Sequence, residues 1–375
     1  MGNEKIKILY IMTHCTKSGP IQQMLNLIKY LDPNVFRANL ITIYNEDTNG
    51  LSLLNEYKKV IPHTFIPISK KEILLGKTKA IKKALDDFQP DIIHSFGVFP
   101  DYMITRIGYE NHVLTSRNYI YEDYPDQYGK VVGTLLAWIH LYAIKHTKYA
   151  CCCSESLHDI YLKRLGVDLP FIRNGVDISN FALPSENEKE QLKERFNLPL
   201  DKPTIVYGGV FNDRKNQEFL LKCVAGKKEF ENFVFLLLGD GAEYSRLKEQ
   251  YDKYKNIIMP GNTTEMSNYL KASDYYVSTS KSEGLPNGVL EAMACGLPVF
   301  LSDILQHREI LNVNPECGST YLAGDMNSFQ DRFFAFMLRD KYFMSKSAFE
   351  SVRNFFSAQI MSENYQKLYL KIANN

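Results

Sequence analysis

Residues 280–298 read SKSEGLPNGVLEAMACGLP, and this stretch decides the fold. It follows an apolar run at 275–279 that is typical of a buried strand. A helix is expected to begin at Asn287 or Gly288 and to stop at Gly296, because a glycine followed closely by proline commonly ends a helix. The stretch therefore predicts a strand, a loop and a helix, which is the repeating unit of a parallel α/β sheet.

Two glutamates lie on this unit, with Glu283 in the loop and Glu291 about one turn inside the helix. Ligands of open parallel sheets bind at the carboxyl ends of the strands, and a helix N-terminus favours a diphosphate. Gly284 and Gly288 let the backbone approach such a ligand closely. Two carboxylates repel phosphate, so they are interpreted as acceptors for sugar hydroxyls. The competing interpretation is a solvated loop glutamate and a second one on the helix surface, stabilised by the helix dipole.

The same alternation of strand and helix extends through the whole chain and indicates an α/β protein with doubly wound parallel sheets. A charged stretch with prolines near its ends, 184–202, is predicted to be a linker with one short helix. It separates two units, at roughly 1–182 and 183–355. The expected strands are 7–13, 38–44, 91–96, 112–117, 150–154 and 171–173 in the first unit, and 204–208, 233–238, 256–259, 275–279 and 298–302 in the second.

The bulk properties agree with two globular domains. The chain has 375 residues and a formal net charge of +1, which gives no electrostatic footprint for nucleic acid. Its seven cysteines show no metal-binding spacing, so no metal site is predicted. The start of the chain lacks a signal-peptide pattern, and the longest apolar stretch, 131–144, is too short to span a bilayer. We therefore expect a cytoplasmic protein.

A second loop with candidate chemistry is YGGVFNDRKNQ, residues 207–217, directly after the first strand of the second unit. Arg214 and Lys215 are cations at the opening of a helix, where they are suited to neutralise a leaving diphosphate without a metal ion. Gly209 is predicted to give a close backbone approach. Taken alone, the segment is equally an ordinary basic loop.

Residues 283–298 resemble the E-x7-E signature of retaining GT-B glycosyltransferases of the family-4 type, including its EAMACGxPV continuation. The resemblance implies the GT-B fold, in which two Rossmann-like doubly wound domains face each other across a cleft. It implies that Glu283 contacts the donor sugar, that Glu291 holds the ribose of the nucleotide, and that Arg214 and Lys215 take part in catalysis. It also implies that backbone N–H groups bind sugar and phosphate oxygens at Gly284, Leu285, Asn287, Gly288 and Val289.

The resemblance is partial in the first unit, which it makes the acceptor side. Of the family's glycine-rich loop after the first strand, only Gly19 remains. His94 ends a strand like the family's, and we interpret it as a buried structural histidine, with a sugar contact as the alternative. Relatives carry a histidine near the end of the next strand, where this chain has Arg117 and Asn118. One of these two would have to take its place beside the sugar or the acceptor.

Three further segments bear on the acceptor side. Residues 119–128 form a tyrosine-rich, acidic loop, expected either to stack on an acceptor sugar or to pack on its own domain. The lysine-rich segment 70–83 is interpreted as a solvated helix face or as a surface that docks on an anionic bilayer. By resemblance, the last helix, about 356–375, packs back onto the first unit.

The function that follows from the resemblance is transfer of a sugar, with retention of anomeric configuration, from a nucleotide-sugar donor of the UDP-linked type. The acceptor is expected to be a saccharide or a lipid-linked saccharide of bacterial cell-surface polysaccharide synthesis, with peripheral membrane contact at the inner face. The donor is a substrate, and no cofactor is predicted. The alternatives are a nucleotide-sugar epimerase of similar fold, a phosphorylase with a pyridoxal cofactor and a non-catalytic protein that binds nucleotide sugars.

Overall fold

The computed structural model describes residues 4–46 and 51–375. The chain divides into two compact units, Met1–Gly175 together with Ala358–Asn375, and Val176–Ser357. We call them unit 1 and unit 2 and describe each by itself. The chain enters unit 2 at Val176, whereas the sequence placed this boundary after residue 182.

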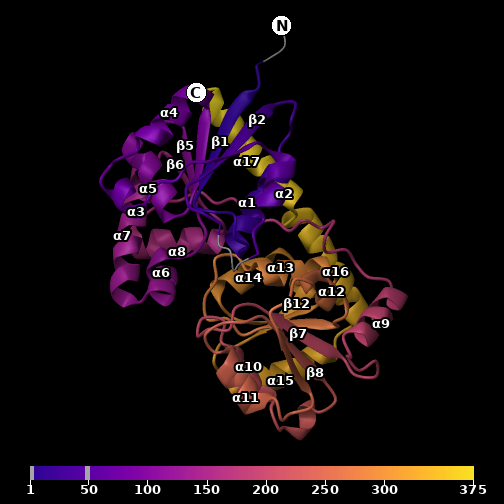
Figure 1. The fold of residues 1–375 in the computed structure, drawn as a ribbon. Coiled ribbons are helices and arrows are strands. Elements are labelled where there is room, and N and C mark those ends of the chain that lie inside the picture. The colour runs from indigo at the N-terminus through magenta and orange to yellow at the C-terminus, as the bar shows by residue number, and fades with distance from the viewer. Residues whose placement is uncertain (1–3, 47–50) are drawn as a thin grey trace. The chain divides into compact units, whose positions relative to one another are not determined.

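Unit 1 is built on a six-stranded parallel sheet with the order β3-β2-β1-β4-β5-β6 (Figure 1). Alternate residues of β1 enter separate hydrophobic clusters, since Tyr10 and Met12 belong to one and Leu9 and Ile11 to the other. Both faces of the sheet are therefore covered, as the apolar runs predict. The strands are β1 Ile6–Met12, β2 Phe36–Thr42, β3 His63–Phe65, β4 Ile92–Phe96, β5 His112–Ser116 and β6 Tyr149–Cys152.

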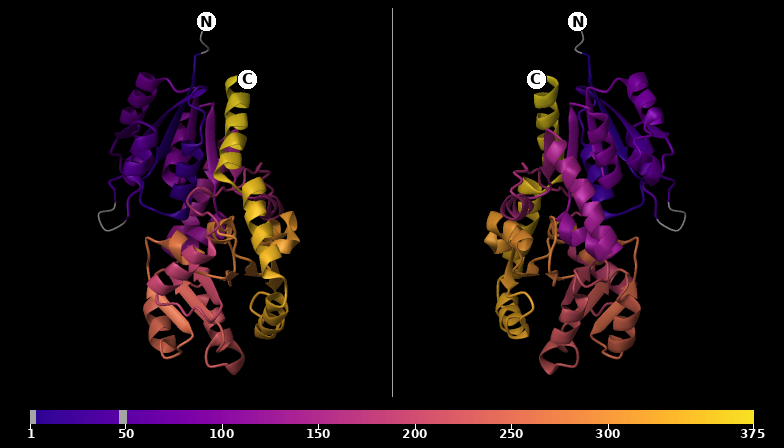
Figure 2. Two further views of the ribbon diagram at one scale, coloured as in Figure 1. Left: turned by 90° about the vertical axis from the view of Figure 1, so that its right-hand side faces the viewer. Right: turned by 90° about the vertical axis from the view of Figure 1, so that its left-hand side faces the viewer.

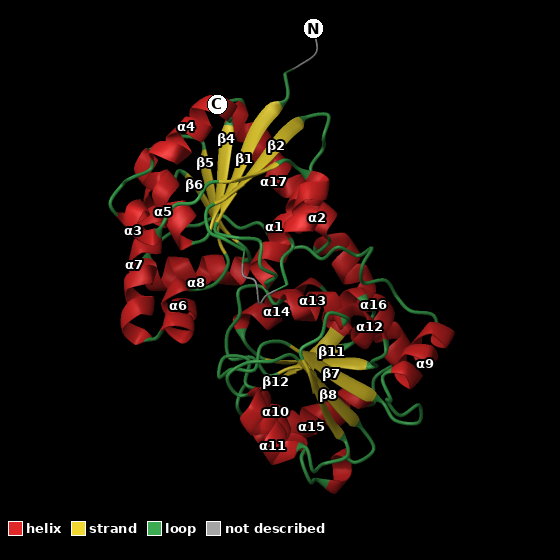
Figure 3. Ribbon diagram, viewed as in Figure 1, coloured by secondary structure: helices red, strands yellow, loops and turns green. Residues whose placement is uncertain are grey.

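The helices of unit 1 follow the strands in the alternating order that produces a doubly wound sheet (Figure 3). They are α1 Gly19–Lys29, α2 Leu54–Val60, α3 Lys70–Leu74, α4 Lys79–Phe88, α5 Val98–Ile107, α6 Ile120–Tyr128, α7 Lys130–His146 and α8 Glu155–Leu165.

The last helix, α17 Ala358–Ala373, can be followed as the yellow ribbon that ends at the C-terminus in Figure 2. It returns to unit 1 and contacts α1 and β4. Tyr365 and Tyr369 are fully buried in the unit 1 core. The Tyr369 hydroxyl pairs with His94 Nδ1 at 2.7 Å, and the Tyr365 hydroxyl pairs with Thr115 Oγ1 at 2.9 Å. The aromatic spacing near the C-terminus therefore marks the buried face of a helix that completes the first unit.

Unit 2 contains a second six-stranded parallel sheet, with the order β12-β11-β10-β7-β8-β9. Its strands are β7 Thr204–Gly208, β8 Val234–Leu238, β9 Ile257–Gly261, β10 Tyr275–Ser278, β11 Val299–Ser302 and β12 Gly318–Tyr321. Its helices are α9 Glu186–Arg195, α10 Gln217–Val224, α11 Tyr244–Tyr251, α12 Met266–Lys271, α13 Asn287–Ala294, α14 Leu305–Val313, α15 Met326–Met337 and α16 Lys341–Phe355, with short 3-10 turns at Lys228–Phe230 and Pro315–Cys317.

The structure corrects two local predictions. The strand expected at 171–173 is wrong, because Phe171 makes only an isolated bridge to Cys152 and the segment does not extend the sheet. The tyrosine-rich segment 119–128 is helix α6 rather than a loop. Within the described ranges, no helix combines the length and apolar character needed to cross a bilayer.

Candidate active site

Glu283 is a buried carboxylate at the strand ends of unit 2, in the loop between β10 and α13. Its side chain is 6% exposed and accepts two ion-pair hydrogen bonds. Lys215 Nζ donates to Glu283 Oε1 at 2.6 Å, and Arg214 Nη1 donates to Oε2 at 2.8 Å. Arg214 also donates to the Ser282 carbonyl at 2.8 Å. The two loops that the sequence singled out separately thus meet in one cluster, which we call the Glu283 cluster (Arg214, Lys215 and Glu283).

The order of the strands explains why these loops meet, because β7 and β10 are neighbours in the sheet. The Lys215 carbonyl accepts hydrogen bonds from Tyr207 on β7 and from Thr279 just after β10. Asn212 Oδ1 accepts the backbone N–H of Lys215 at 2.9 Å, which closes the loop on itself. The backbone of Lys215 is therefore fixed by hydrogen bonds from side chains at the ends of both strands.

The Glu283 carboxylate is held in its ionised form. Burial would raise its pKa, but the charges of Lys215 and then Arg214, with their hydrogen bonds, outweigh burial and hold the pKa well below its usual value. A carboxylate oxygen has two lone pairs, so each oxygen retains acceptor capacity beside its ion pair. Glu283 can therefore accept a hydroxyl group without giving up both cations.

Helix α13 begins next to the end of β7. A side-chain Cβ at Gly288 would lie 2.8 Å from the Tyr276 hydroxyl and 3.6 Å from the Gly208 carbonyl oxygen. The Tyr276 hydroxyl donates to that same carbonyl at 3.3 Å. The glycine thus allows the first turn of α13 to pack against Tyr276. Gly284, Leu285 and Val289 are buried around this turn, while Asn287 and Glu291 are half-buried.

The glycines of the two neighbouring loops have a packing role. Gly239, after β8, has a φ of +129°, and a Cβ there would lie 2.0 Å from the Gly209 carbonyl oxygen. Gly241 has a φ of +157°, and its Cβ would lie 2.4 Å from the Phe211 carbonyl oxygen. Only glycine permits such crossings, which bring a second loop against the backbone of Gly209 and Phe211. The donor contact predicted at Gly209 stays a prediction.

His307, near the start of α14, lies at the same edge of the sheet, in a segment (307–309) that resembles the family and that the sequence indicates to be mainly structural. It is fully buried, and its Nδ1 lies 2.8 Å from the Ser302 carbonyl, so Nδ1 carries the proton. Its Nε2 is buried with no hydrogen-bond partner. Burial lowers its pKa to about 4, and the charges of Glu283 and Lys215 both act on it. It comes just after β11, the strand next to β10.

The sequence-predicted residues of unit 1 have different environments. His94 is fully buried, and its ring nitrogens pair with Tyr369 at 2.7 Å and Thr115 at 3.2 Å, which suits the structural interpretation. Gly19 is the first residue of α1, directly after the N-cap Ser18. Asn118 donates to Asp123 Oδ1 at 3.0 Å.

Arg117 is 9% exposed and lines a cavity of unit 1. Arg117 directly follows Ser116, the last residue of β5, and precedes the short loop that leads to α6. The strand predicted at 112–117 places it at this end of β5. The cavity lies in the other unit from the Glu283 cluster.

Two family models match the chain. A model described as glycosyl transferases group 1 matches residues 188–341, and one described as glycosyltransferase family 4 matches residues 23–180. An Escherichia coli relative named UDP-Gal:alpha-D-GlcNAc-diphosphoundecaprenol alpha-1,3-galactosyltransferase is 27% identical, over 100% of this chain and 92% of the relative. The O-antigen biosynthesis glycosyltransferase WclY of Escherichia coli is 25% identical, over 80% of each chain.

Solved structures share the architecture. A glycosyltransferase from Rickettsia africae ESF-5 superposes with a TM-score of 0.79 at 20% identity, covering 99% of both chains. Anabaena Alr3699/HepE, solved in complex with UDP, superposes with a TM-score of 0.78 at 15% identity, covering 98% of this chain and 100% of that one. At these identities the likeness shows the fold.

Proposed function

Because this chain belongs to the group 1 glycosyltransferases and has the GT-B fold, we propose that it transfers a sugar from a nucleotide-sugar donor to a saccharide or lipid-linked acceptor with retention of anomeric configuration. We place this reaction in bacterial cell-surface polysaccharide synthesis. The names of the relatives support the setting, since one acts on a diphosphoundecaprenol-linked sugar and another belongs to O-antigen biosynthesis.

The observation that carries the proposal is the Glu283 cluster. Breaking a bond to a nucleoside diphosphate develops negative charge on the leaving phosphate, and preorganised cations stabilise that charge strongly. Lys215 and Arg214 are such cations, and their loop is fixed to the ends of β7 and β10. In the free chain Glu283 pairs with both cations and offsets one of their two positive charges. An arriving diphosphate would share these cations, and Glu283 would accept hydroxyls of the donor sugar.

Glu291 and the first turn of α13 complete the donor site in this proposal. Glu291 lies on the same helix whose first turn packs beside β7, and its charge acts on Tyr276 as the charge of Glu283 does. We assign Glu291 to the ribose hydroxyls. The backbone N–H groups of Gly284, Leu285, Asn287, Gly288 and Val289 are assigned to sugar and phosphate oxygens.

The donor is proposed to be UDP-linked and the reaction metal-independent. The name of one relative includes UDP-galactose, and a structural neighbour was solved with UDP. In the described residues no group of three or more His, Cys, Asp or Glu side chains is arranged to hold a metal ion. Arg214 and Lys215 would supply the positive charge in its place.

Retention is supported by the family type and by the relative named for an alpha-1,3 linkage. We assign no side chain as general base. Catalysis would rest on positioning the donor and stabilising the diphosphate, with the leaving phosphate receiving the acceptor proton.

The test is a thermal-shift panel of nucleotide sugars, with and without a chelator, because a specific ligand raises the melting temperature by mass action. One UDP-sugar is expected to stabilise the protein equally in both conditions. Transfer from that donor, followed by NMR assignment of the product anomer, then tests retention. No stabilisation by any nucleotide sugar would contradict the proposal, and interconversion of the free donor without an acceptor would indicate an epimerase.

A further inference from the structure

Arg117 is a buried cation with incomplete hydrogen bonding. Its residue is 9% exposed, and Nη1 donates to Asn174 Oδ1 at 2.6 Å. Its Nε and Nη2 are buried and have no hydrogen-bond partner. In the part of the chain that the structure describes, no carboxylate forms an ion pair with it. Its charge acts on four neutral side chains, Tyr57, His94, Cys151 and Tyr365. The Asp123 carboxylate lines the same cavity as Arg117.

A buried cation without an anion lowers the stability of the folded protein. A guanidinium carries a permanent charge and five N–H donors, and burying it without an anion sacrifices its hydration. Unpaired buried polar groups are rare in native proteins, and a bound ion is one of the features that explain them. The arrangement of Arg117 therefore points to an anion that is absent from the free chain.

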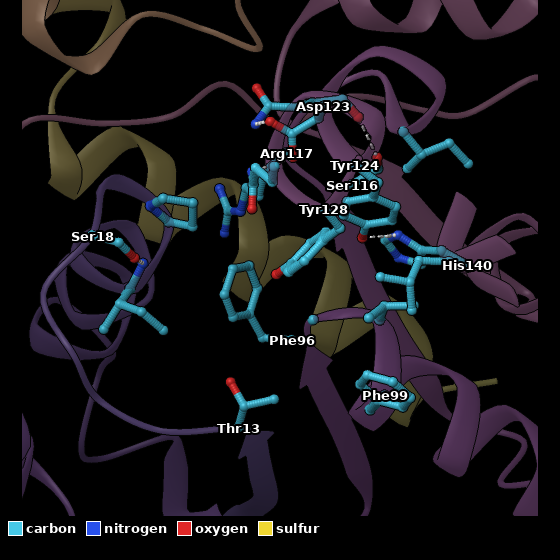
Figure 4. Close-up of a pocket in the computed structure, with 18 of the residues that line it drawn as sticks. Thr13, Ser18, Phe96, Phe99, Ser116, Arg117, Asp123, Tyr124, Tyr128 and His140 are labelled. Carbon is cyan, nitrogen blue, oxygen red and sulfur yellow. Dashed lines mark hydrogen bonds between the residues drawn. The ribbon is translucent and has the colours of Figure 1, made fainter. Parts of the chain in front are cut away.

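Arg117 lines a cavity of about 560 Å³ in unit 1 (Figure 4). Arg117 lies beside Phe96, with the guanidinium carbon 5.8 Å from the centre of that ring. Ser18, the N-cap of α1, lines the same cavity, so the positive end of a helix dipole also faces it. Tyr44 lines it too, and its hydroxyl is buried with no partner. This polar part of the cavity can therefore offer several donors to one anion.

Part of the cavity wall is apolar and includes Val132, which is also exposed on the surface of α7, while Asp123, Gln127 and His140 are polar residues of the same wall. The apolar wall includes Phe99, Tyr128, Val132 and Leu136. On α7, Val131, Leu135 and Trp138 are 85%, 61% and 66% exposed and follow one another at helical spacing. We call these three residues, with Val132, the α7 apolar face. Helix α7 contains no acidic residue and has Lys130 and Lys145 near its ends.

Helices α6 and α7, which contribute to the apolar part of the cavity wall, are held together by close packing and a buried polar network. Gly133 of α7 allows the approach of α6, since a Cβ there would lie 2.4 Å from the Tyr124 carbonyl oxygen. The Tyr124 hydroxyl pairs with His140 Nδ1 at 2.6 Å, and His140 Nε2 pairs with Asp101 at 3.0 Å. The apolar wall is therefore preformed beside the guanidinium.

We propose that this cavity binds the phosphate or diphosphate group of a lipid-linked acceptor, with Arg117 as its counter-ion and the lipid chain along the α7 apolar face. An anion binder with an apolar exit fits an amphiphilic anion better than a free sugar or an inorganic ion. The inference rests on the proposed function for the identity of the acceptor, and it gives Arg117 a role apart from the donor diphosphate, which we assign to Lys215 and Arg214.

The experiment measures binding by isothermal titration calorimetry with three probes: farnesyl diphosphate, farnesol and inorganic pyrophosphate. The variants are Arg117→Met and Val132→Asp, with Arg106→Met as a matched control on the exposed surface of unit 1. Arg117→Met is expected to weaken farnesyl diphosphate binding at least about tenfold and to leave UDP binding unchanged. Val132→Asp, at a half-exposed site, is expected to weaken the binding of farnesyl diphosphate and to leave the binding of pyrophosphate unchanged. The control is expected to bind as the wild type does.

Equal affinity of wild type and Arg117→Met for farnesyl diphosphate would overturn the proposal, and so would no binding of that probe by the wild type. Loss of UDP affinity in Arg117→Met without loss of farnesyl diphosphate affinity would also overturn it, since the arginine would then serve the donor. Arginine-dependent binding of farnesyl diphosphate by a protein that transfers no sugar would uphold the anion site and count against the proposed function alone.

Discussion

Lys215 Nζ lies 2.6 Å from Glu283 Oε1, and this contact joins the two loops that carry the proposed donor chemistry. Both side chains are largely buried, at 16% and 6% exposure. A buried pair of this kind makes each partner depend on the other, because removing one leaves an uncompensated charge.

Glu283→Gln and Lys215→Ala are each expected to lower kcat by roughly 100-fold or more while the fold persists, because each removes a preorganised charge from the site. Each should also cost about 3 kcal/mol of unfolding free energy, since the ion pair is broken on one side. Steady-state kinetics and urea unfolding of the purified variants check both numbers. Lys281→Ala is the matched control, because its ion pair with Asp213 is exposed and lies on the same two loops. Normal transfer rates in both variants would refute the site assignment.

Gly239→Ala is expected to destabilise unit 2 by more than about 2 kcal/mol, because the new methyl group meets the Gly209 backbone and the φ of +129° is unfavourable for alanine. It should also weaken donor binding, since the Gly209 loop precedes Lys215. Gly324→Ala is the control, with a φ of +80° and no atom within 4 Å of the added carbon. Thermal unfolding and UDP titration measure the two effects. Equal losses of thermal stability and of UDP affinity in the two variants would show that the close packing of the Gly209 and Gly239 loops is not required for either property.

Buried neutral histidines predict a loss of stability on mild acidification. Burial lowers the pKa of His307 in unit 2 and of His112 in unit 1 to about 4. The unfolded chain takes up protons near its ordinary pKa of ~6.5, so unfolding is favoured as pH falls from that value toward 4. Each histidine should contribute about 2 kcal/mol of loss between pH 6.5 and pH 5. Urea unfolding at both pH values tests this, and His307→Gln should show a smaller loss. A flat profile in the wild type would show that these rings are protonated in the folded state.

Arg117→Met is expected to leave the melting temperature of the ligand-free protein unchanged or to raise it by a few degrees, because an unpaired buried charge is replaced by an apolar side chain of similar length. Differential scanning calorimetry without ligand measures the change. A clear drop in melting temperature would mean that the arginine stabilises the fold, which would weaken the case for a binding role.

Most of the architecture could be predicted because the central strands are continuous apolar runs. The edge strands β3 and β12 were missed, since His63–Phe65 and Gly318–Tyr321 are short, with polar residues and partial exposure. Helix α6 was missed because Pro125 and a run of tyrosines resemble a loop in sequence. In each case the flanking tertiary structure, rather than local propensity, decides the conformation.

The sequence named the residues of the candidate site but could not give their arrangement. Strand ends placed Glu283 and Lys215 on the same edge of a sheet, but sequence could not show that their side chains pair with each other. Nor could it show that Nε and Nη2 of Arg117 are buried with no hydrogen-bond partner, because that depends on how the surrounding side chains pack.

The most direct test of the donor site compares UDP and uridine binding to the wild type and to Lys215→Met by calorimetry in the presence of a chelator. We predict that the wild type binds UDP much more tightly than uridine, and that the variant loses at least about tenfold in UDP affinity with no change for uridine. Equal UDP affinity in the two proteins would contradict the claim that the Glu283 cluster binds the donor diphosphate.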